Sequence, residues 1–245
     1  MSTTLLTPEP ETAHEPVTDE LTPGYYLSGQ QLGPYVTGLL ARCRSVFDIK
    51  PIMTGDLDAP AVAGLGDRGG VIEDGAFVSG DVIVQRGGRV EAGARVTGPV
   101  LVCEGAVVSA GAYVRDHVVI GPGTQVGFGA EITRSLLGAH VFAKHACFIG
   151  DSVVGSRVNF GAFSSTTGLI TSGGPVTEPA VKEITVTLDS RTYGTGQTKF
   201  GAVIGDGVTL SAGTILCPGT LIGPRTVIYP RTQLGGFMPA GSRVR

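Results

Sequence analysis

The sequence has little charge, few histidines and no long apolar stretch. Charged residues make up 16% of the 245 residues, the formal net charge is −3, and there are four histidines. A net charge this close to zero gives no general attraction to nucleic acid or to an anionic membrane surface. No run of about 18 apolar residues occurs, and the first residues lack the basic and apolar pattern of a signal peptide. We therefore expect a cytoplasmic protein with a small-molecule substrate, no nucleic-acid partner and no membrane partner.

Cysteines are also few, and they show no pairing pattern. The four are Cys43, Cys103, Cys147 and Cys217, and none forms a CxxC motif. Scattered cysteines of this kind are typical of reduced thiols in a cytoplasmic protein. Neither a disulfide framework nor a cysteine-based metal site is predicted.

A strict six-residue period takes the place of helical or simple strand patterns. Eleven aliphatic residues recur at every sixth position: Ile72, Val78, Val84, Val90, Val96, Val102, Val108, Val114, Ile120, Val126 and Ile132. A second run has the same period: Ile204, Leu210, Leu216, Ile222, Ile228 and Leu234. A helix has a period near 3.6 and a half-buried strand a period of two, so neither explains a period of six. Hexapeptide repeats are the sequence mark of a parallel β-helix.

Each repeat is interpreted as a short strand followed by a corner. The aliphatic residue points inward, and four positions later a small or mid-sized residue lies where the chain turns, from Ala76 through Ala94 and Ala112 to Leu136. Three repeats close one coil of about 18 residues, so that like positions stack into interior columns. The predicted fold class is all-β: a left-handed parallel β-helix of hexapeptide repeats. The register slips around Leu136 and Leu137.

The residues before the repeats have a different composition. Residues 1–20 are rich in Glu, Pro and Thr and are expected to form a disordered tail. Residues 21–70 are predicted to form a helical cap and a connector. Within them, 28–47 has helical spacing of apolar residues with Ser28 as the N-cap, and this helix is expected to cover the open first coil.

The β-helix is predicted to span 71–235, with an insertion at 168–198 and a short tail at 236–245. The six-residue period is lost within the insertion. It begins with a Gly/Ser-rich loop, continues with an alternating strand at 183–189, and returns from Arg191 as the hairpin partner of that strand. An excursion on one side of a solenoid often marks its binding face.

Histidine is the residue most suited to catalysis here, because its ordinary pKa lies near neutrality. His14 falls in the expected tail, whereas His117, His140 and His145 lie in or near the coils. His145 is followed by Asn159 one coil later. An imidazole there could take a proton from an amine or hydroxyl that attacks a thioester. A coil histidine can equally be an ordinary surface or corner residue.

Four stretches carry a resemblance to a known family: residues 113–115, 145–151, 159–162 and 199–202. Over about residues 100 to 235 the chain resembles the C-terminal acetyltransferase domain of the bifunctional glucosamine-1-phosphate N-acetyltransferase/uridylyltransferases. Archaeal-type sugar-phosphate nucleotidylyltransferases with this domain look most similar. The resemblance implies transfer of an acyl group, acetyl above all, from acetyl-CoA to an amino sugar or sugar phosphate. It also implies a homotrimer and no required metal.

The resemblance assigns roles to individual residues. His145 corresponds to the general base that deprotonates the acceptor amine. Arg115 corresponds to the arginine that binds sugar phosphate. Phe148 and Asn159 correspond to acceptor contacts, and Ala162 to a residue that touches the acetyl donor. All five are therefore candidate site residues.

Four further residues complete the expected site. Glu131 is assigned to the acceptor side beside Arg115. Lys199, Ala212 and Arg231 are assigned to acetyl-CoA, and Lys199 could meet a phosphate of either substrate. Arg225 and Arg231, six residues apart, could meet the 3′-phosphate of CoA or could equally be ordinary surface charges.

The chain departs from the family pattern at several positions. Thr133 replaces a phosphate-binding lysine, with Arg134 beside it, and Phe148 replaces the usual tyrosine. Gly168 falls where the family has an asparagine. Residues 1–70 are too few for a nucleotidylyltransferase domain, so uridylyl transfer is not expected. These changes are also what a non-catalytic structural or regulatory subunit would show.

A zinc enzyme of the γ-carbonic-anhydrase type is the remaining alternative. His140 and His145 are five residues apart, which is a spacing used by that group, and His117 would be the third ligand. The gap from His117 to His140 and the sequence Arg115-Asp116 do not match its pattern. Asp151 is expected to shape a turn and could orient His145.

Overall fold

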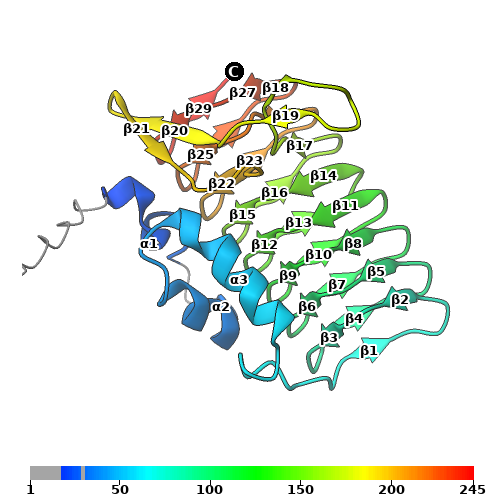
Figure 1. Ribbon diagram of the computed structural model, residues 1–245. Helices are drawn as coiled ribbons and strands as arrows, with labels where there is room; N and C mark the ends of the chain where they lie inside the picture. Colours follow the sequence, from blue (N-terminus) through cyan, green and yellow to red (C-terminus); the bar gives the residue numbers. More distant parts are fainter. Residues whose placement is uncertain (1–17, 29–30) are drawn as a thin grey trace, which may run out of the picture.

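The chain winds into a three-sided solenoid of parallel strands, flanked by helices from its N-terminal part (Figure 1). The structure is a computed structural model and describes residues 18–28 and 31–245. Each coil contributes one strand to each of three sheets, called A, B and C in chain order. The predicted parallel β-helix of hexapeptide repeats, with a helical N-terminal segment and an inserted hairpin, is confirmed.

Along the chain, successive strands of the solenoid belong to sheets A, B and C in turn. Sheet A is made of β1 (Val71–Ile72), β4 (Arg89–Val90), β7 (Val107–Val108), β10 (Gln125–Val126), β13 (Phe142–Ala143), β16 (Asn159–Phe160), β23 (Thr209–Leu210), β26 (Val227–Ile228) and β29 (Arg243–Val244). Sheet B is made of β2 (Phe77–Ser79), β5 (Arg95–Thr97), β8 (Tyr113–Arg115), β11 (Ala130–Thr133), β14 (Cys147–Gly150), β17 (Ser165–Thr166), β24 (Ile215–Leu216) and β27 (Gln233–Leu234). Sheet C is made of β3 (Val82–Val84), β6 (Val100–Val102), β9 (Val118–Ile120), β12 (Leu136–Leu137), β15 (Val153–Val154), β22 (Ala202–Ile204), β25 (Thr220–Ile222) and β28 (Phe237–Met238).

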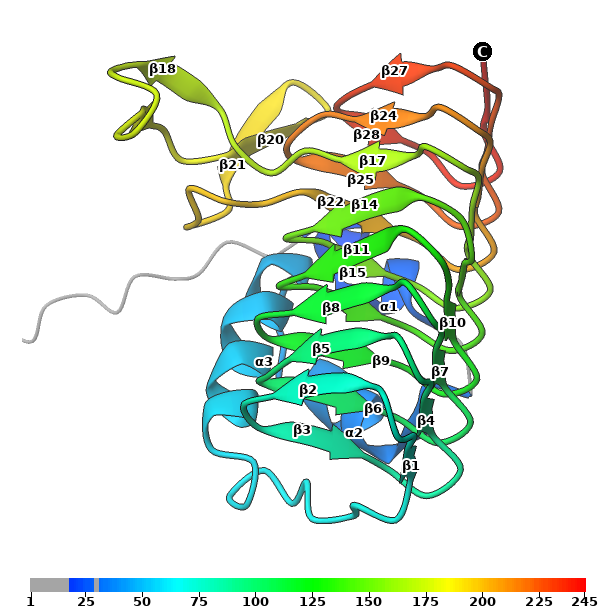
Figure 2. The same ribbon diagram turned by 90° about the vertical axis from the view of Figure 1, so that its right-hand side faces the viewer.

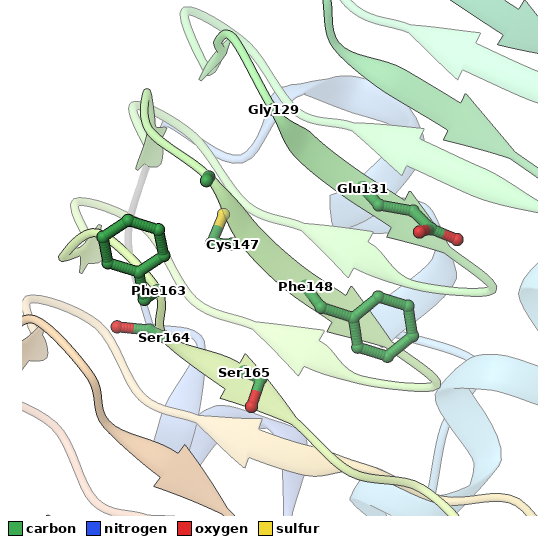
Figure 3. A pocket seen from close by; sticks show the side chains of 8 residues that line it. Gly129, Glu131, Cys147, Phe148, Phe163, Ser164 and Ser165 are labelled. Carbon is green, nitrogen blue, oxygen red and sulfur yellow. The ribbon is translucent and has the colours of Figure 1, made fainter. Parts of the chain in front are cut away.

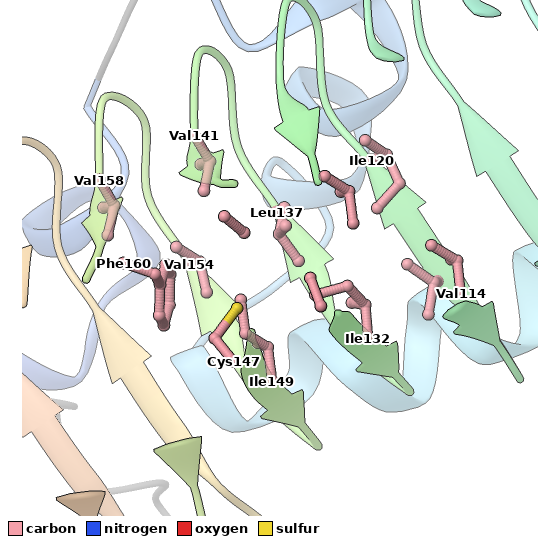
Figure 4. Close-up of a cluster of buried hydrophobic side chains, with 14 of the residues drawn as sticks. Val114, Ile120, Ile132, Leu137, Val141, Cys147, Ile149, Val154, Val158 and Phe160 are labelled. Atoms are coloured by element: carbon pink, nitrogen blue, oxygen red, sulfur yellow. The ribbon is translucent and has the colours of Figure 1, made fainter. Parts of the chain in front are cut away.

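The predicted aliphatic columns fill the interior of the solenoid. Side chains from the three sheets meet along its axis, as Ile149, Val154 and Phe160 do in Figure 4. The residues of both hexapeptide runs belong to this one buried cluster, apart from Ile72 and Val78 at the lower end. Val78 packs against the cluster while partly buried, and Ile72 is 47% exposed because the coil that begins at β1 has no described coil beneath it.

The slip in register is the loss of one residue from a coil. Strand partners are 18 residues apart in the first coils, as in Gln125 with Val107, and 17 apart when Gln125 pairs with Phe142. Leu137 therefore takes the interior place after Ile120, and Leu136 faces the helices instead of filling a corner. The expectation that Leu136 occupies an inward corner position is wrong for this reason.

The outer face of sheet C is as apolar as its inner face, and the helices cover it. Ile83, Leu101, Val119, Leu136, Val153, Val203 and Leu221 point outward into a second buried cluster. The helices on this face are α1 (Pro23–Tyr26), α2 (Gly33–Leu40), η2 (Val46–Asp48) and α3 (Ile49–Asp58), preceded by η1 (Asp19–Leu21). They lie along the side of the solenoid (Figure 1) and do not close its first coil, contrary to expectation.

The helical region also differs in detail from the prediction. The helix expected over 28–47 is limited to α2, and the backbone N–H of Ser28 donates to Asp206 instead of capping a helix. The region expected as a connector contains α3, whose Pro51 lies in the first turn, where a missing N–H costs no helical hydrogen bond. None of the helices in the described part of the chain is long and apolar enough to span a bilayer.

At its C-terminal end the solenoid extends further than predicted, whereas the N-terminal residues do not contribute to it. The tail expected at 1–20 lies outside the described residues except for 18–20, which lead into η1. At the other end, residues expected as a tail form β28 and β29, which pair with β25 and β26. Met238 and Val244 pack against the interior columns although the spacing has shortened.

The insertion forms two antiparallel hairpins at the edge between sheets B and C (Figure 2). The predicted hairpin is present as β20 (Thr185–Leu188) with β21 (Arg191–Gly194), and it buries Ile184, Val186 and Leu188 against the helical side. The stretch expected as a loop contains β18 (Thr171–Gly173), which pairs with β19 (Ala180–Val181). This first hairpin projects away from the solenoid, with Val176 98% exposed.

Candidate active site

Each coil turns three corners, which we name by the sheets they join: A–B, B–C and C–A. Corner residues often have positive φ, which glycine adopts without strain and other residues adopt at a cost of about 1–2 kcal/mol. Eleven non-glycine residues have positive φ among those described, and several carry charge. The chemistry of this protein is therefore concentrated at its corners.

His145 lies at an A–B corner, between β13 and β14, with its side chain exposed. Ala162, Ala212 and Arg231 occupy the A–B corners of the next three coils, so four of the predicted site residues form one column. Backbone hydrogen bonds join the column: the N–H of Gly213 donates to the carbonyl of Ala162 at 2.9 Å, and that of Arg231 to Ala212 at 3.0 Å. Among the described residues, His145 makes no side-chain hydrogen bond or ion pair.

A groove of about 370 Å³ runs from this corner onto the outer face of sheet B (Figure 3). Eight residues line it: Gly129, Glu131, Ala146, Cys147, Phe148, Phe163, Ser164 and Ser165. Ala146 follows His145 directly, so His145 is adjacent in sequence to the lining of the groove without being part of it. Strand pairing places Glu131, Phe148 and Ser165 side by side on adjacent strands. Two of the predicted acceptor contacts, Glu131 and Phe148, thus line the groove, and His145 lies next in sequence to a third lining residue.

Arg115 and Glu131 form an ion pair on the same face. Nη2 and Nε of Arg115 donate to Oε1 of Glu131 at 2.6 and 3.1 Å. Nη1 donates to the buried hydroxyl of Thr133 at 3.3 Å, and the guanidinium lies 5.6 Å from the ring centre of Tyr113. The predicted phosphate ligand Arg115 is therefore already bonded to a carboxylate.

Two predicted site residues lie on other surfaces. Asn159 is exposed on sheet A, where it pairs with Phe142, and reaches the groove only around the A–B corner. Lys199 lies at a B–C corner, at the end of the insertion, across sheet B from Ala162, Ala212 and Arg231. Its backbone carbonyl accepts a hydrogen bond from Lys50 at 2.8 Å. Within one chain, Lys199 is not grouped with the other residues assigned to acetyl-CoA.

A series of ionic contacts runs along the B–C corners and involves residues outside the predicted site. It starts at the end of α3, where Asp58 Oδ1 lies 2.8 Å from His117 Nε2. The other ring nitrogen, Nδ1, lies 2.8 Å from Asp116 Oδ1. Because an imidazole donates to two carboxylates only when it carries both protons, this geometry favours the imidazolium form. His117 is fully engaged and unsuited to act as a base.

The chain of contacts continues across the next two coils. Arg134 donates from Nη1 to Asp116 at 2.8 Å, and from Nε and Nη2 to both oxygens of Asp151 at 2.9 Å. Lys50 of α3 donates to Asp151 at 3.2 Å. The series of ionic contacts thus begins and ends at α3, through Asp58 and Lys50, and it holds that helix against the solenoid at two points. Asp151 binds these cations and does not orient His145, which lies on a different corner.

The pKa values of these groups follow from their surroundings. Burial alone lowers the pKa of His117, but the hydrogen bonds to Asp58 and Asp116 outweigh it, so the pKa is raised. Burial opposes ionisation of Asp151, yet Arg134 and Lys50 hold its pKa below the usual value. Burial raises the pKa of the Cys147 thiol to about 12, so this groove residue is not a nucleophile.

The three coil histidines lie on three different corners. His117 is at a B–C corner, His140 at a C–A corner and His145 at an A–B corner. The described residues contain no group of three or more His, Cys, Asp or Glu placed to hold a metal ion. A three-histidine zinc site within one chain does not fit this arrangement.

Comparison with known proteins identifies the repeats. The family described as GMPPB C-terminal domain matches residues 96–224, just over half of the chain. The chain belongs to this family. The matched GMPPB C-terminal domain contains His145, its groove, and Ala162 and Ala212, and it ends before Arg231. It also contains Asp116, His117, Arg134 and Asp151, whereas α3 with Lys50 and Asp58 lies outside it.

The solved structures include a protein that resembles the chain more distantly. The crystal structure of the polySia specific acetyltransferase NeuO is 14% identical, with 70% of this chain and 80% of that chain covered and a TM-score of 0.25. At that identity and TM-score, the likeness bears on neither activity nor substrate. None of the curated proteins matches this member of the GMPPB C-terminal domain family.

Proposed function

We propose that the protein is an acyl-CoA-dependent N-acyltransferase, using acetyl-CoA, that acts on an amino sugar or a sugar phosphate or nucleotide. The observation that carries this proposal is the position of His145, which is exposed, has no side-chain partner among the described residues and is next in sequence to the lining of the 370 Å³ groove. Membership of the hexapeptide-repeat GMPPB C-terminal domain family is consistent with a sugar-related substrate. A cytoplasmic location, with its supply of acyl-CoA, belongs to the same proposal.

His145 acts as the general base in this proposal. It takes a proton from the acceptor amine while the amine attacks the thioester carbonyl, so that a C–N bond forms and the C–S bond breaks. The proton then returns to the departing thiolate. The acceptor lies in the groove between Glu131 and the ring of Phe148, which provides an apolar wall and no hydroxyl. Positioning of the two substrates supplies much of the rate.

The acetyl donor is assigned to the A–B corner column above His145. Ala162 and Ala212 keep that column narrow, and the exposed guanidinium of Arg231 at its upper end suits a phosphate of CoA. Lys199 lies on another corner, so it could contribute only from a neighbouring copy in an oligomer. Asn159 is likewise assigned to an acceptor that extends around the corner.

A homotrimer, with sites between subunits, is part of the proposal. Three phenylalanines around the A–B corner support it, because Phe128 is 76%, Phe163 74% and Phe142 38% exposed. Large exposed apolar side chains that are grouped on one surface indicate an interaction site. A second copy placed there would bury these rings and close the groove.

The decisive experiment is an acceptor screen with acetyl-CoA in which free thiol release is measured. We expect turnover with at least one amino sugar, and a loss of roughly 10²–10⁴-fold in rate for His145→Gln. His140→Gln is the matched control, since His140 is also an exposed corner histidine but lies on another edge. Equal rates for the wild type and the His145 variant would reject the assigned role.

A non-catalytic subunit is the second candidate, and one observation favours it. Arg115 is bonded to Glu131, and Thr133 stands where the resembling family has a lysine, so the phosphate site is weakened. Thermal stability with CoA and acetyl-CoA separates the two. A ligand at 100 times its Kd adds about 2.7 kcal/mol to the free energy of unfolding, whereas a protein that has lost the site shows no shift.

A further inference from the structure

The C–A corners hold a pattern that the proposed function does not use. One position in each of these corners has positive φ, and it is occupied in successive coils by Gly87, Gly105, Gly123, His140, Arg157, Gly207, Arg225 and Gly241. Glycine is the residue that adopts this conformation without strain. The three exceptions are all basic side chains, which indicates that charge, and not backbone geometry, explains their presence.

Two of these basic residues flank a pocket. The pocket has a volume of about 330 Å³ and is lined by Ser28, Arg157, Asp206, Gly207, Pro224 and Arg225. Arg157 and Arg225 lie in the coils on either side of the coil of Gly207. Adjacent strands are about 4.8 Å apart, so the two arginines are separated by roughly 10 Å along the corner. Because Gly207 has no side chain, the space between them stays open.

The guanidinium groups at this pocket are unpaired. Neither Arg157 nor Arg225 makes a side-chain hydrogen bond or an ion pair with any residue that the structure describes, and both are exposed. Arg243, whose guanidinium donates to the carbonyl of Arg225 at 3.3 Å, brings a third positive charge to the same corner. Such a concentration of unpaired cations attracts anions.

The one carboxylate in the pocket is already hydrogen bonded. Oδ1 of Asp206 accepts from the backbone N–H of Ser156 at 2.6 Å, and Oδ2 accepts from the N–H and the hydroxyl of Ser28 at 3.0 and 3.5 Å. Asp206 is buried, with 7% of its surface exposed, and the hydrogen-bond partners of its carboxylate among the described residues are Ser28 and Ser156. It holds the segment at Ser28 against the corner and leaves the arginines available.

We propose that Arg157 and Arg225 form a binding site for the phosphate or diphosphate group of a small molecule. Guanidinium groups bind phosphate oxygens through paired, charge-assisted hydrogen bonds. The hydroxyl of Ser28, at the pocket wall, can donate a further hydrogen bond to a ligand in place of its long 3.5 Å contact with Asp206. A volume of 330 Å³ is at the lower end for small-molecule pockets and suits a phosphate or diphosphate group. The site lies on a different corner from His145 and is separate from the proposed catalytic groove.

The test uses glycine substitutions, because glycine is the residue that neighbouring coils carry at the same position. Arg157→Gly and Arg225→Gly remove the charge and relieve the backbone, so both variants are expected to fold, with far-ultraviolet circular dichroism as the check. His140→Gly is the matched control: it removes a basic type of side chain from the same column but outside the pocket. Binding of inorganic phosphate and pyrophosphate is measured by calorimetry, with ionic strength held constant by sodium chloride.

We expect the wild-type protein to bind pyrophosphate more tightly than phosphate. Each arginine variant should weaken pyrophosphate binding at least tenfold, and His140→Gly should leave it unchanged. No binding to the wild type, or unchanged binding in Arg157→Gly and Arg225→Gly, would overturn the proposal. Equal weakening in all three variants would show a general electrostatic effect and would overturn it too.

Discussion

Two corners of the same solenoid treat histidine in opposite ways. At the B–C corner, both ring nitrogens of His117 lie 2.8 Å from carboxylates, and the contacts continue through Arg134 to Asp151. At the A–B corner, His145 is exposed and has no side-chain partner among the described residues. The same residue type therefore has two different roles. His117, which is paired, holds elements together, whereas His145, which has no partner among the described residues, remains available to a ligand.

The difference follows from what lies against each corner. α3 packs beside the B–C corner, where it buries Lys50 and brings Asp58 to His117. Buried charges are stable only when paired, so this edge selects complementary partners. Nothing in the described part of the chain covers the A–B corner, and there the side chains face solvent and the groove.

The largest expected effect comes from removing the imidazole at the A–B corner. His145→Gln should lower acetyl transfer by roughly 10²–10⁴-fold, because the base is lost, while the free energy of unfolding changes by less than about 0.5 kcal/mol, as for an ordinary surface substitution. Rate and urea unfolding are measured on the same preparation. A large loss of stability with unchanged turnover would mean that this corner, too, is structural.

Removing the ion pairs of the B–C corner should instead lower the free energy of unfolding. Asp151→Asn keeps the shape of the side chain but removes the charge that Lys50 and Arg134 share, and the side chains of Asp151 and Lys50 are only 7% and 8% exposed. Leaving buried cations unpaired should cost about 3–5 kcal/mol in urea unfolding. The double variant Lys50→Met/Asp151→Asn should recover part of this loss. If the single variant costs less than about 1 kcal/mol, the ion pairs do not hold α3.

The pH dependence of stability sharpens the contrast. The raised pKa of His117 means that its contribution is fully present below its unfolded pKa and is lost as pH rises through the folded value. The free energy of unfolding of the wild type should therefore exceed that of His117→Asn. The difference should be largest near pH 6 and should shrink progressively towards pH 9. Because Asp58 is largely exposed, the difference should stay below about 1 kcal/mol.

Denaturant midpoints across that pH range provide the measurement, and asparagine tolerates the positive φ of this corner. His145→Asn, which removes a corner histidine without an ion-pair partner among the described residues, is the control and is measured over the same pH range. The lowered pKa values of Asp116 and Asp151 act in the opposite direction: their contribution is present above the unfolded value and is lost as pH falls through the folded one. A His117 difference that grows with pH would contradict the assigned charge state.

The smallest expected effect concerns the ion pair of Arg115 with Glu131 on sheet B, which lies between the A–B and B–C corners. Glu131→Gln should release Arg115 at a cost of less than about 1 kcal/mol, since both side chains are about one-third exposed. If Arg115 then binds an acceptor phosphate, the ratio of KM for a phosphorylated acceptor to KM for its unphosphorylated counterpart should fall severalfold. An equal change for both acceptors would remove Arg115 from phosphate recognition.

The solenoid could be predicted because its signal is local and repeated. The period of six fixes the interior columns, and the slip at Leu136 and Leu137 shows as a missing residue in one coil. The position of the helices had a signal as well. Strands of sheet C, such as Val82–Val84 and Val100–Val102, are apolar at every position, which is typical of strands covered on both faces. The helices therefore had to lie on that side.

The site was predicted less completely, because it depends on contacts between distant residues. The column of His145 with Ala162, Ala212 and Arg231 follows from coil geometry and the resemblance. The pairing of Lys50 with Asp151 joins residues 101 apart, and no period reveals it. One signal was present: charged residues recur at Asp116, Arg134 and Asp151, 17 or 18 apart, which is one coil.

The insertion leaves the solenoid and returns to it at one point. The N–H of Phe200 donates to the carbonyl of Gly168 at 2.9 Å, and β16 pairs with β23 as if the intervening residues did not exist. We therefore expect the pairing of the coils to be independent of the length of the insertion. The outer hairpin, with β18 and β19, can be shortened or exchanged for foreign sequence without disturbing the coils. The inner hairpin, with β20 and β21, cannot, because Ile184, Val186 and Leu188 are part of the flank.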